Sequence, residues 1–414
     1  MTRSDPAQPR TPHGSPIDTD GPHIPMYTEE FAADPHAAYR EMRRRFGSLA
    51  PVELAPDVPA TLVIGYRTAV RILNDPEHFP ADPRIWQRTA PPDSPVMPML
   101  EWRPNALRSA GTEHTRYRQA NVAAINGVDM HALHSIVERI AVPLINSFCT
   151  EGAADLVAQY AFPLAFEAIN GMLGCPPEIG RRIAEGQAAI WDGVNADKGN
   201  LMISEAVLEL VRLKRTRPGD DVVSRLVADP AELSDEEMLH QIVTLYGAGI
   251  EPQRNLITNT LVLMLTDERF AGGLLGGALS SRDALDEVLF TDPPGANYCV
   301  SYPRQPILID DVWLPAHQPV VISMAACNND PAVGAREFID NRSHLAWSIG
   351  PHACPARSAA YLIAQDAIDQ LLDALPEIRL AVANSALRWR PGPFHRALAA
   401  LPVAFPPSLP LQIT

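Results

Sequence analysis

The chain has 414 residues, of which 46% are hydrophobic and 20% are charged, values that are ordinary for a soluble globular protein. It contains 49 acidic and 34 basic side chains, so the formal net charge is −15 and neither nucleic acid nor an anionic membrane is a favourable partner. No apolar run approaches the roughly 20 residues that a membrane-spanning helix needs.

The N-terminal stretch is polar and rich in proline, and it lacks the apolar core of a signal peptide. We expect residues 1–25 to be a flexible leader on a cytoplasmic protein, and residues 26–414 to form a single domain because no linker divides them. The five cysteines are odd in number and widely spread, which argues against a disulfide framework or a structural zinc. Four of them are interpreted as small buried hydrophobic residues: Cys149, Cys175, Cys299 and Cys327.

The first half of the chain predicts one short strand, a long loop and then helices. Residues Thr61 to Ile64 form a strand-like run, and the helical pattern that follows stops before Pro76. Residues 80–110 are rich in proline, arginine and tryptophan and show little periodicity, which predicts a long loop. Most of residues 112–280 follow a helical pattern.

The longest predicted helix begins at a capping box, in which Ser234 is followed three residues later by Glu237. Its periodicity continues to about Leu265, so we expect an apolar helix roughly 45 Å long that crosses the middle of the molecule. Residues 297–325 and the C-terminal tail are strand-like. The pattern therefore predicts a mainly α protein with a minor β region.

Near the C-terminus, HLAWSIGPHACPARSAAYLIAQ places Cys354 immediately before a helical pattern. We expect Pro355 at the first helical position and Cys354 near the N-cap, where the helix dipole favours a thiolate. Gly350 would let the backbone pass close to a flat or bulky group. A thiolate there suits a metal ligand or a nucleophile, although His352 is poorly placed as a base; a buried structural cysteine is the third reading. The buried face of the helix is predicted to contain Ala364, Ile368, Leu371, Leu372 and Leu375.

This segment resembles the haem loop of the cytochrome P450 family, Phe-Gly-x-Gly-x-His-x-Cys-x-Gly. The spacing of Gly350, His352 and Cys354 is kept, and Trp347 occupies the aromatic position. Four further stretches resemble the family in the same order, so that the resemblance extends from about residue 30 to 405: EHTRYRQ, GAGIEP, DVWLPAHQPVVISMAACNNDP and LRWRPGPFHRALAALPVAF.

The resemblance implies the cytochrome P450 fold, with the long central helix over haem b, and Cys354 as the axial iron ligand. In the family, thiolate ligation donates electron density to iron and favours O–O cleavage. His114, Arg118 and His352 would neutralise the haem propionates. The remaining cofactor-binding residues that it implies are Ala248, Gly249, Trp347 and Gly350.

The central helix departs from the family pattern of an acid followed by threonine, because here Glu251 is followed by Pro252. Proline supplies no hydroxyl, and inside a helix it leaves the carbonyl of Ala248 without its hydrogen bond. We therefore expect these three residues to shape the oxygen-binding side. The protons would come through water from Glu251 or from the substrate itself.

Two further positions depart from the family. The Glu-x-x-Arg pair is reduced to Glu287, since Phe290 stands where the arginine is expected; Glu287 either pairs with a cation such as Arg342 or is solvated. Val300 stands where many relatives have another propionate-binding arginine. The chain thus resembles an atypical bacterial subgroup.

Three functions follow from the resemblance. The first is a monooxygenase or oxidase of specialised metabolism that uses O2 and electrons from a ferredoxin or flavodoxin to oxidise a natural product. The second is oxidative cross-linking of aromatic side chains in a peptide, which could be held by Trp86 and Trp102 of the 80–110 loop, although an ordinary variable lid is the simpler interpretation of that loop. The third is a haem-binding protein without catalysis.

Overall fold

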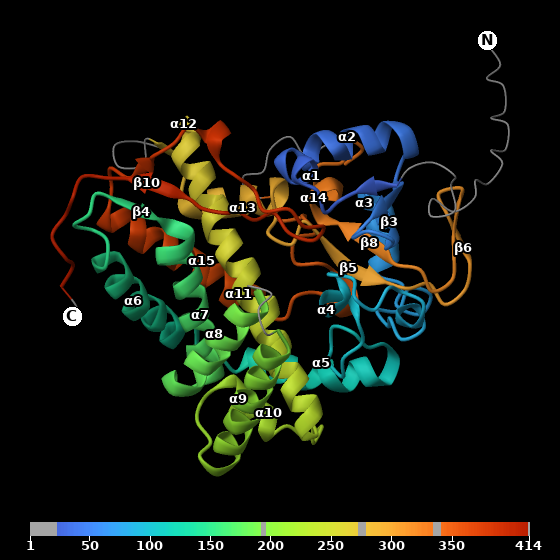
Figure 1. The fold of residues 1–414 in the computed structure, drawn as a ribbon, viewed down its shortest axis with the longest axis horizontal. Coiled ribbons are helices and arrows are strands. Elements are labelled where there is room, and N and C mark those ends of the chain that lie inside the picture. The colour runs from blue at the N-terminus through green and yellow to red at the C-terminus, as the bar shows by residue number, and fades with distance from the viewer. Residues whose placement is uncertain (1–22, 192–195, 272–278, 334–340, 413–414) are drawn as a thin grey trace, which may run out of the picture.

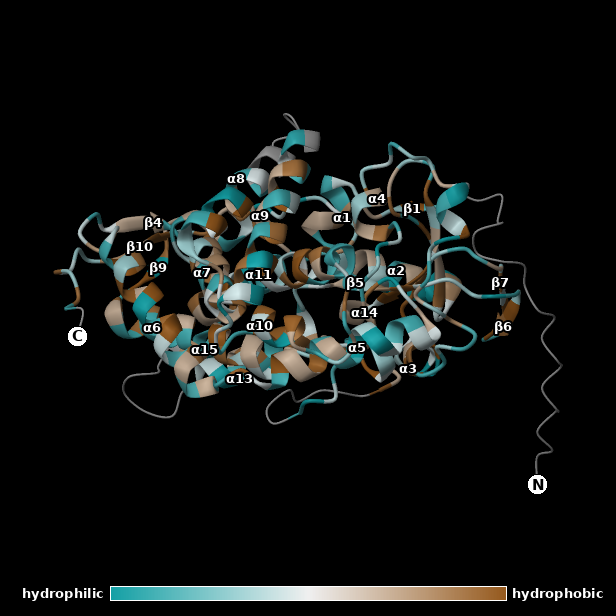
Figure 2. Ribbon diagram, turned by 90° about the horizontal axis from the view of Figure 1, so that it is seen from below, coloured by the Kyte–Doolittle hydropathy of each residue, from teal (hydrophilic) through white to brown (hydrophobic). Residues whose placement is uncertain are grey.

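The computed structural model describes residues 23–191, 196–271, 279–333 and 341–412, so most of the expected leader lies outside the described residues. Most of the longer helices lie on one side of the molecule, and the main sheet lies on the other side together with the three N-terminal helices among these residues (Figure 1). Hydropathy varies along most helices, with polar and apolar residues on different faces (Figure 2). The prediction of a mainly α fold with a minor β region is confirmed. Among the described residues, no helix is both long enough and apolar enough for a membrane span.

The α-helices are α1 (Glu29–Ala33), α2 (Pro35–Phe46), α3 (Tyr66–Leu73), α4 (Met97–Leu100), α5 (Gly111–Asn126), α6 (Met130–Asn146), α7 (Phe162–Leu173), α8 (Pro177–Trp191), α9 (Ala196–Thr216), α10 (Val222–Val227), α11 (Asp235–Thr266), α12 (Glu268–Ala271), α13 (Ser281–Thr291), α14 (Met324–Asn328) and α15 (Arg357–Ala374). A π-helical turn at Val157–Ala161 leads into α7. Short 3-10 turns lie at Trp86–Arg88, Gly350–His352 and Asn384–Ala386.

The main sheet has the strand order β1-β2-β3-β8-β5 and mixes parallel and antiparallel pairs. The strands are β1 (Ile24–Pro25), β2 (Leu49–Glu53), β3 (Pro59–Val63), β5 (Asn297–Ser301) and β8 (Val320–Ser323). The strand expected at 61–64 is therefore found slightly earlier, and the following helix α3 begins after Gly65. Smaller sheets contain β6 (Ile307–Ile309) with β7 (Val312–Leu314), and β4 (Ala153–Asp155) with β10 (Pro402–Ala404) and β9 (Arg379–Leu380).

Helix α11 crosses the middle of the molecule, as its length and apolar pattern predict (Figure 1). The capping box is present: the Ser234 hydroxyl accepts from the Glu237 amide, and the Glu237 carboxylate accepts from the Ser234 amide. Arg116 of α5 forms an ion pair with the same carboxylate at 2.5 Å. The start of the central helix is thereby joined to α5, which contributes His114 and Arg118 to the site described below.

The segment from 80 to 110 contains two short helical turns but otherwise follows the predicted loop. Trp86 is only 5% exposed and packs against Tyr302, with ring centroids 5.5 Å apart. Arg84 lies over the Trp102 ring, 5.2 Å from its centroid. Trp86 is therefore part of the core beside the sheet, which removes it from the residues available to hold a substrate.

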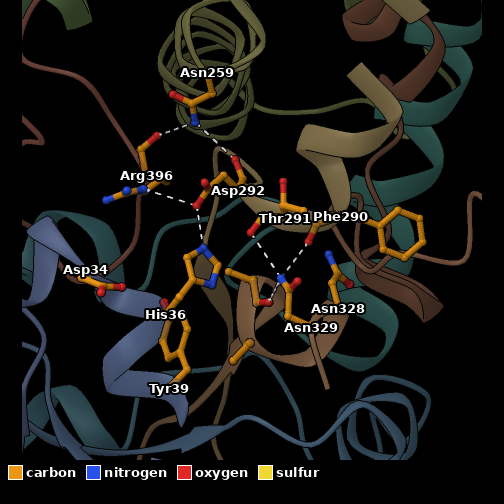
Figure 3. Close-up of polar contacts among 12 residues, drawn as sticks. Asp34, His36, Tyr39, Asn259, Phe290, Thr291, Asp292, Asn328, Asn329 and Arg396 are labelled. Carbon is orange, nitrogen blue, oxygen red and sulfur yellow. Dashed lines mark hydrogen bonds and ion pairs between the residues drawn. The ribbon is translucent and has the colours of Figure 1, made fainter. Parts of the chain in front are cut away.

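A group of contacts joins both ends of the chain to the centre (Figure 3). Asp292, at the end of α13, accepts from His36 of α2 at 2.8 Å and forms an ion pair with Arg396 at 3.3 Å. Asn259 of α11 donates to the backbone carbonyls of Asp292 and Arg396. Asn329 donates to the Phe290 and Thr291 carbonyls. The C-terminal end of α13 is thus fixed by polar side chains from several elements.

The missing arginine of the Glu-x-x-Arg pair is replaced by other contacts. Glu287 forms an ion pair with Arg269 at 2.7 Å, so the alternative in which it pairs with a cation is confirmed, although that cation is not Arg342. Arg342 instead donates to Asp286 at 3.3 Å. Phe290 packs edge-on against His344, with ring centroids 5.2 Å apart. Arg342 bonds Asp286 and not Glu287 because adjacent residues of a helix point in different directions. Asp286, one residue earlier on α13, faces the segment that leads to Cys354.

Asp286 also accepts a hydrogen bond from the hydroxyl of Tyr361 on α15, at 3.0 Å. Its side chain is 5% exposed, so these contacts satisfy a carboxylate that would otherwise be costly to bury. Because Arg342 precedes Cys354 and Tyr361 follows it, Asp286 joins the two flanks of the cysteine loop. Asn328 adds a link, since it donates to Leu289 O and accepts from the Leu345 amide.

We predict that Asp286→Asn lowers the free energy of unfolding by about 1–2 kcal/mol, because the ion pair with a half-exposed arginine is lost while the shape is kept. Chemical denaturation followed by circular dichroism measures this value. Asp373→Asn, at an exposed position of α15, is the matched control. Equal stability of the two variants would show that Asp286 does not brace the loop.

Candidate functional site

The cysteine loop is a tight turn packed on the end of α3. The Cys354 amide donates to the Trp347 carbonyl at 2.7 Å and closes the turn. Ser348 has a φ of +55° and Gly350 a φ of +71°. A Cβ on Gly350 would lie 2.3 Å from the carbonyl oxygen of Leu73. The backbone of α3 at Leu73 therefore requires glycine at this position.

The helix that follows begins later than predicted. Its N-cap is Ala356 and its first residue is Arg357, so Pro355 lies before the helix and Cys354 lies two residues before the N-cap. The shift reflects the backbone of Ala356, whose φ of −99° and ψ of 17° lie outside the helical range. The predicted buried face is confirmed except at Leu372, which is half-buried: Ala364, Ile368, Leu371 and Leu375 are at most 2% exposed.

Some of the surroundings of the Cys354 thiol disfavour its thiolate form and others favour it. Burial raises the pKa of Cys354, and the Ala356 amide together with the charges of Arg118 and Arg357 opposes that rise. The Ala356 amide at the helix N-cap favours the thiolate as expected, but burial outweighs it and the pKa of Cys354 is raised. A metal cation at the sulfur would reverse the balance, because a coordinating thiol is deprotonated.

Three potentially cationic side chains converge on one side of this loop. His114 and Arg118 occupy successive turns of α5, and their neighbour His352 comes from the loop itself. The rings of His114 and His352 are 4.1 Å apart. The Arg118 guanidinium donates to the carbonyl of Ala353. The structure therefore brings together all three residues that the sequence suggested as carboxylate-binding groups.

These side chains are incompletely satisfied. His114 is 7% exposed, and its Nε2 has no hydrogen-bond partner among the described residues. Burial and the charge of Arg118 lower the pKa of His114. Burial, followed by the neighbouring His114 and Arg118, lowers the pKa of His352 to about 3. A carboxylate placed between these groups would supply both the missing acceptor and the missing negative charge.

Helix α11 presents a turn of small residues in its middle. Ala248 is exposed although most of the helix is buried, and a Cβ on Gly247 would meet nothing within 4 Å. Gly249 faces α7 instead, where a Cβ would lie 2.9 Å from Ile169. Of the two small residues predicted to face the cofactor, Ala248 is thus open and Gly249 is packed.

Glu251 lies on the same helix and is held by two arginines. Its Oε1 accepts from Arg254 at 2.5 Å, from Asn255 at 3.2 Å and from Arg390 of the C-terminal segment. The helix continues unbroken across Pro252. The sequence suggested Glu251 but missed Arg254 and Arg390, because neither belongs to the family's motif and Arg390 is distant in the chain.

Helix α11 and the helix that follows the cysteine loop, α15, are joined by a direct contact. Gln253 of α11 donates to the carbonyl of Ala360 on α15 at 3.1 Å. Val300, where relatives have an arginine, lies in an irregular part of β5. The sequence also missed Arg108, which donates to the Tyr298 hydroxyl at 2.8 Å; its position in an arginine-rich loop was the only available signal.

The residues present fit a flat cofactor with carboxylate substituents and one thiolate-bound metal. The thiol, the unpaired imidazole nitrogen and the half-buried guanidinium of Arg118 lie on one side, and the small-residue turn of α11 is linked to them through α15. No group of three or more His, Cys, Asp or Glu side chains in the described part of the chain could hold a metal by itself. A single cysteine ligand to a haem iron is compatible with that finding.

No family model matches the chain. It is 26% identical over 401 residues to cytochrome P450 107B1 of Saccharopolyspora erythraea, and the match covers 92% of this chain and 98% of that protein. It is 28% identical over 389 residues to cytochrome P450 monooxygenase PikC of Streptomyces venezuelae, covering 91% and 92%. Among solved structures, CYP154C4 from Streptomyces sp. W2061 superimposes with a TM-score of 0.82 at 25% identity, covering 92% and 98%.

These similarities extend over nearly the whole of both chains in each comparison. The relatives that these comparisons find are bacterial cytochrome P450s and the chain has the cytochrome P450 fold, so it is an oxidoreductase whose cofactor is haem b.

Proposed function

We propose that the protein is a monooxygenase of specialised metabolism, with Cys354 as the iron ligand, that inserts one oxygen atom into a natural product. Bacterial monooxygenases of natural-product metabolism are among its relatives, including PikC. The observation that carries the proposal is the convergence of His114, Arg118 and His352 beside the Cys354 loop. The electrons would come from a ferredoxin or a flavodoxin.

Each residue around the cysteine has a separate task in this proposal. Cys354 holds the iron, and the closed turn from Trp347 fixes the direction of its sulfur. His114, Arg118 and His352 bind the propionates and replace the water that those carboxylates lose on burial. When bound, haem b supplies the redox chemistry with dioxygen, which the protein tunes through the thiolate and its surroundings.

The oxygen-binding side lacks the hydroxyl that the family normally uses. Pro252 cannot donate or hold a proton, and its missing N–H leaves the Ala248 carbonyl free of a bond from that position. Glu251 directly precedes Pro252 on the helix. We assign it to the route by which protons reach the site from solvent, with Arg254 and Arg390 fixing its Oε1.

Oxidative coupling of aromatic side chains in a peptide is the second candidate. One observation favours it, namely that Pro252 provides no alcohol to deliver protons, because phenol and indole groups of a substrate can supply protons and electrons themselves. The burial of Trp86 weighs against the 80–110 loop as the holder of such a peptide. The two candidates differ in the fate of the oxygen atom.

We predict that the reduced, carbon monoxide-bound protein shows the red-shifted Soret band of thiolate-bound haem and that Cys354→Ser abolishes it. Serine has a hydroxyl in place of the thiol, so the electron donation to iron is lost. An absorption spectrum of each purified protein after haem supplementation is sufficient. Cys175→Ser, which removes a half-buried thiol elsewhere, should keep the band; a colourless wild-type protein would refute the proposed function.

Turnover under oxygen-18 gas distinguishes the two reactions. We expect the product to gain one labelled oxygen atom, measured by mass spectrometry on a compound first selected because it shifts the haem absorption on binding. Loss of two hydrogens without label would instead establish aromatic coupling and reject the monooxygenase proposal.

For Glu251→Gln we expect product formation to fall about tenfold or more, with more of the consumed oxygen released as hydrogen peroxide, because the amide keeps the shape but cannot relay a proton. Oxygen uptake, peroxide and product are measured together. Glu236→Gln, an exposed change on the first turn of α11, is the control. If Glu251→Gln couples oxygen to product as well as this control does, Glu251 is not on the proton route.

A further inference from the structure

A cavity of about 60 Å³ lies between the end of α3, the 80–110 loop and β5, and His352 forms part of its wall. This volume admits several water-sized groups, since one water needs about 10–15 Å³ by the same measure. Arg108, Tyr298, Val300, Ser301 and Tyr302 also line it. Val300, the strand position where relatives have an arginine, and His352 of the cysteine loop therefore line the same cavity.

Arg108 is presented to this cavity by a braced backbone. Its amide donates to the Asn105 side-chain oxygen at 2.9 Å, and the Asn105 amide group donates to Thr244 of α11 at 2.8 Å. Gln241 of α11 donates to the carbonyl of Pro104 at 3.1 Å. The loop that carries Arg108 is thus attached to the central helix at adjacent points, so little further ordering is needed to bind a ligand.

The guanidinium of Arg108 has a neutral partner and no counter-ion. Its Nη2 donates to the hydroxyl of Tyr298 at 2.8 Å. Within the described residues, no carboxylate forms an ion pair with Arg108. A partly buried cation without an anion is unfavourable, so the arrangement is suited to a ligand that brings negative charge.

Two hydroxyl groups in the same wall also lack partners. Ser301 is 7% exposed and Tyr302 is 3% exposed, and neither hydroxyl has a hydrogen-bond partner in the part of the chain that the structure describes. Buried polar groups are satisfied in the great majority of cases. A carboxylate in the cavity would accept from these donors together with Arg108.

We propose that Arg108, positioned by Tyr298, binds a haem propionate in this cavity and replaces the arginine that is missing at Val300. The inference rests on the proposed function, because it assigns the carboxylate to the cofactor. A substrate carboxylate has the same chemistry, but the shared wall favours the cofactor: His352 lies two residues before Cys354 and also approaches the backbone of Ala106 in the Arg108 loop.

The test is the rate at which haem leaves the holoprotein for an excess of apomyoglobin, measured by absorption without substrate. Arg108→Gln should release haem about tenfold or more faster than the wild type, because it removes a charge-assisted hydrogen bond. Arg103→Gln changes an exposed arginine of the same loop that pairs with Glu101, and it should release haem at the wild-type rate. Adding Val300→Arg to Arg108→Gln should restore retention by supplying the cation from β5.

A second arm uses haem whose propionates are esterified. The wild-type protein should lose the dimethyl ester faster than it loses haem, and Arg108→Gln should show a smaller difference between the two cofactors, because it keeps only the propionate contacts of His114, Arg118 and His352. If Arg108→Gln does not fold, Arg108→Lys takes its place and should show the same reduced difference, because lysine lacks the planar pair of donors. A substrate-binding role for Arg108 predicts instead that Arg108→Gln and Arg103→Gln lose haem equally, and that result overturns the inference.

The two proposals fail in different ways. A wild-type protein without the thiolate-type spectrum refutes the proposed function itself. A normal spectrum combined with equal haem loss from Arg108→Gln and Arg103→Gln refutes only the role of Arg108.

Discussion

The hydrogen bond from the Cys354 amide to the Trp347 carbonyl closes the turn on which the site depends. The turn is tight enough to need positive φ angles at Ser348 and Gly350. An L-residue such as Ser348 adopts that conformation only when its surroundings impose it. Those surroundings are the end of α3, helices α13 to α15 and the α5 guanidinium of Arg118. The direction of the sulfur is therefore fixed, because several elements contact the loop and hold its backbone in one conformation.

Contacts that the family usually obtains from one arginine are distributed here over several side chains. Phe290 contributes only packing against His344, whereas Asp286 contributes the charge that binds Arg342 and Tyr361. The arrangement tolerates the loss because a helix places adjacent residues only about 100° apart, so a neighbouring acid can reach the same segment. The same principle underlies the inferred replacement at Val300, where a cation from a different segment faces the same cavity.

The motifs near the site were predictable to the extent that they are local. The capping box at Ser234, the central helix and the apolar face of α15 depend on residues within a few positions of one another, and all three are present as expected. The grouping of His114 with His352 was predictable only through the family resemblance. The start of α15 was not, because Ala356 has the non-helical angles φ −99° and ψ 17°, which its residue type does not specify.

Sequence alone determined the class of fold, through composition and periodicity, and the absence of a hydroxyl at Pro252, through residue type. The interpretation of the Cys354 segment as a haem loop came from its resemblance to the cytochrome P450 family. Tertiary structure decided the partners: Arg269 for Glu287, Arg390 for Glu251, and the cavity that brings Arg108 to β5. These pairs join residues that are far apart in the chain or lie on different elements. Their formation depends on how helices and strands pack, and no local pattern specifies which distant charge will be nearest.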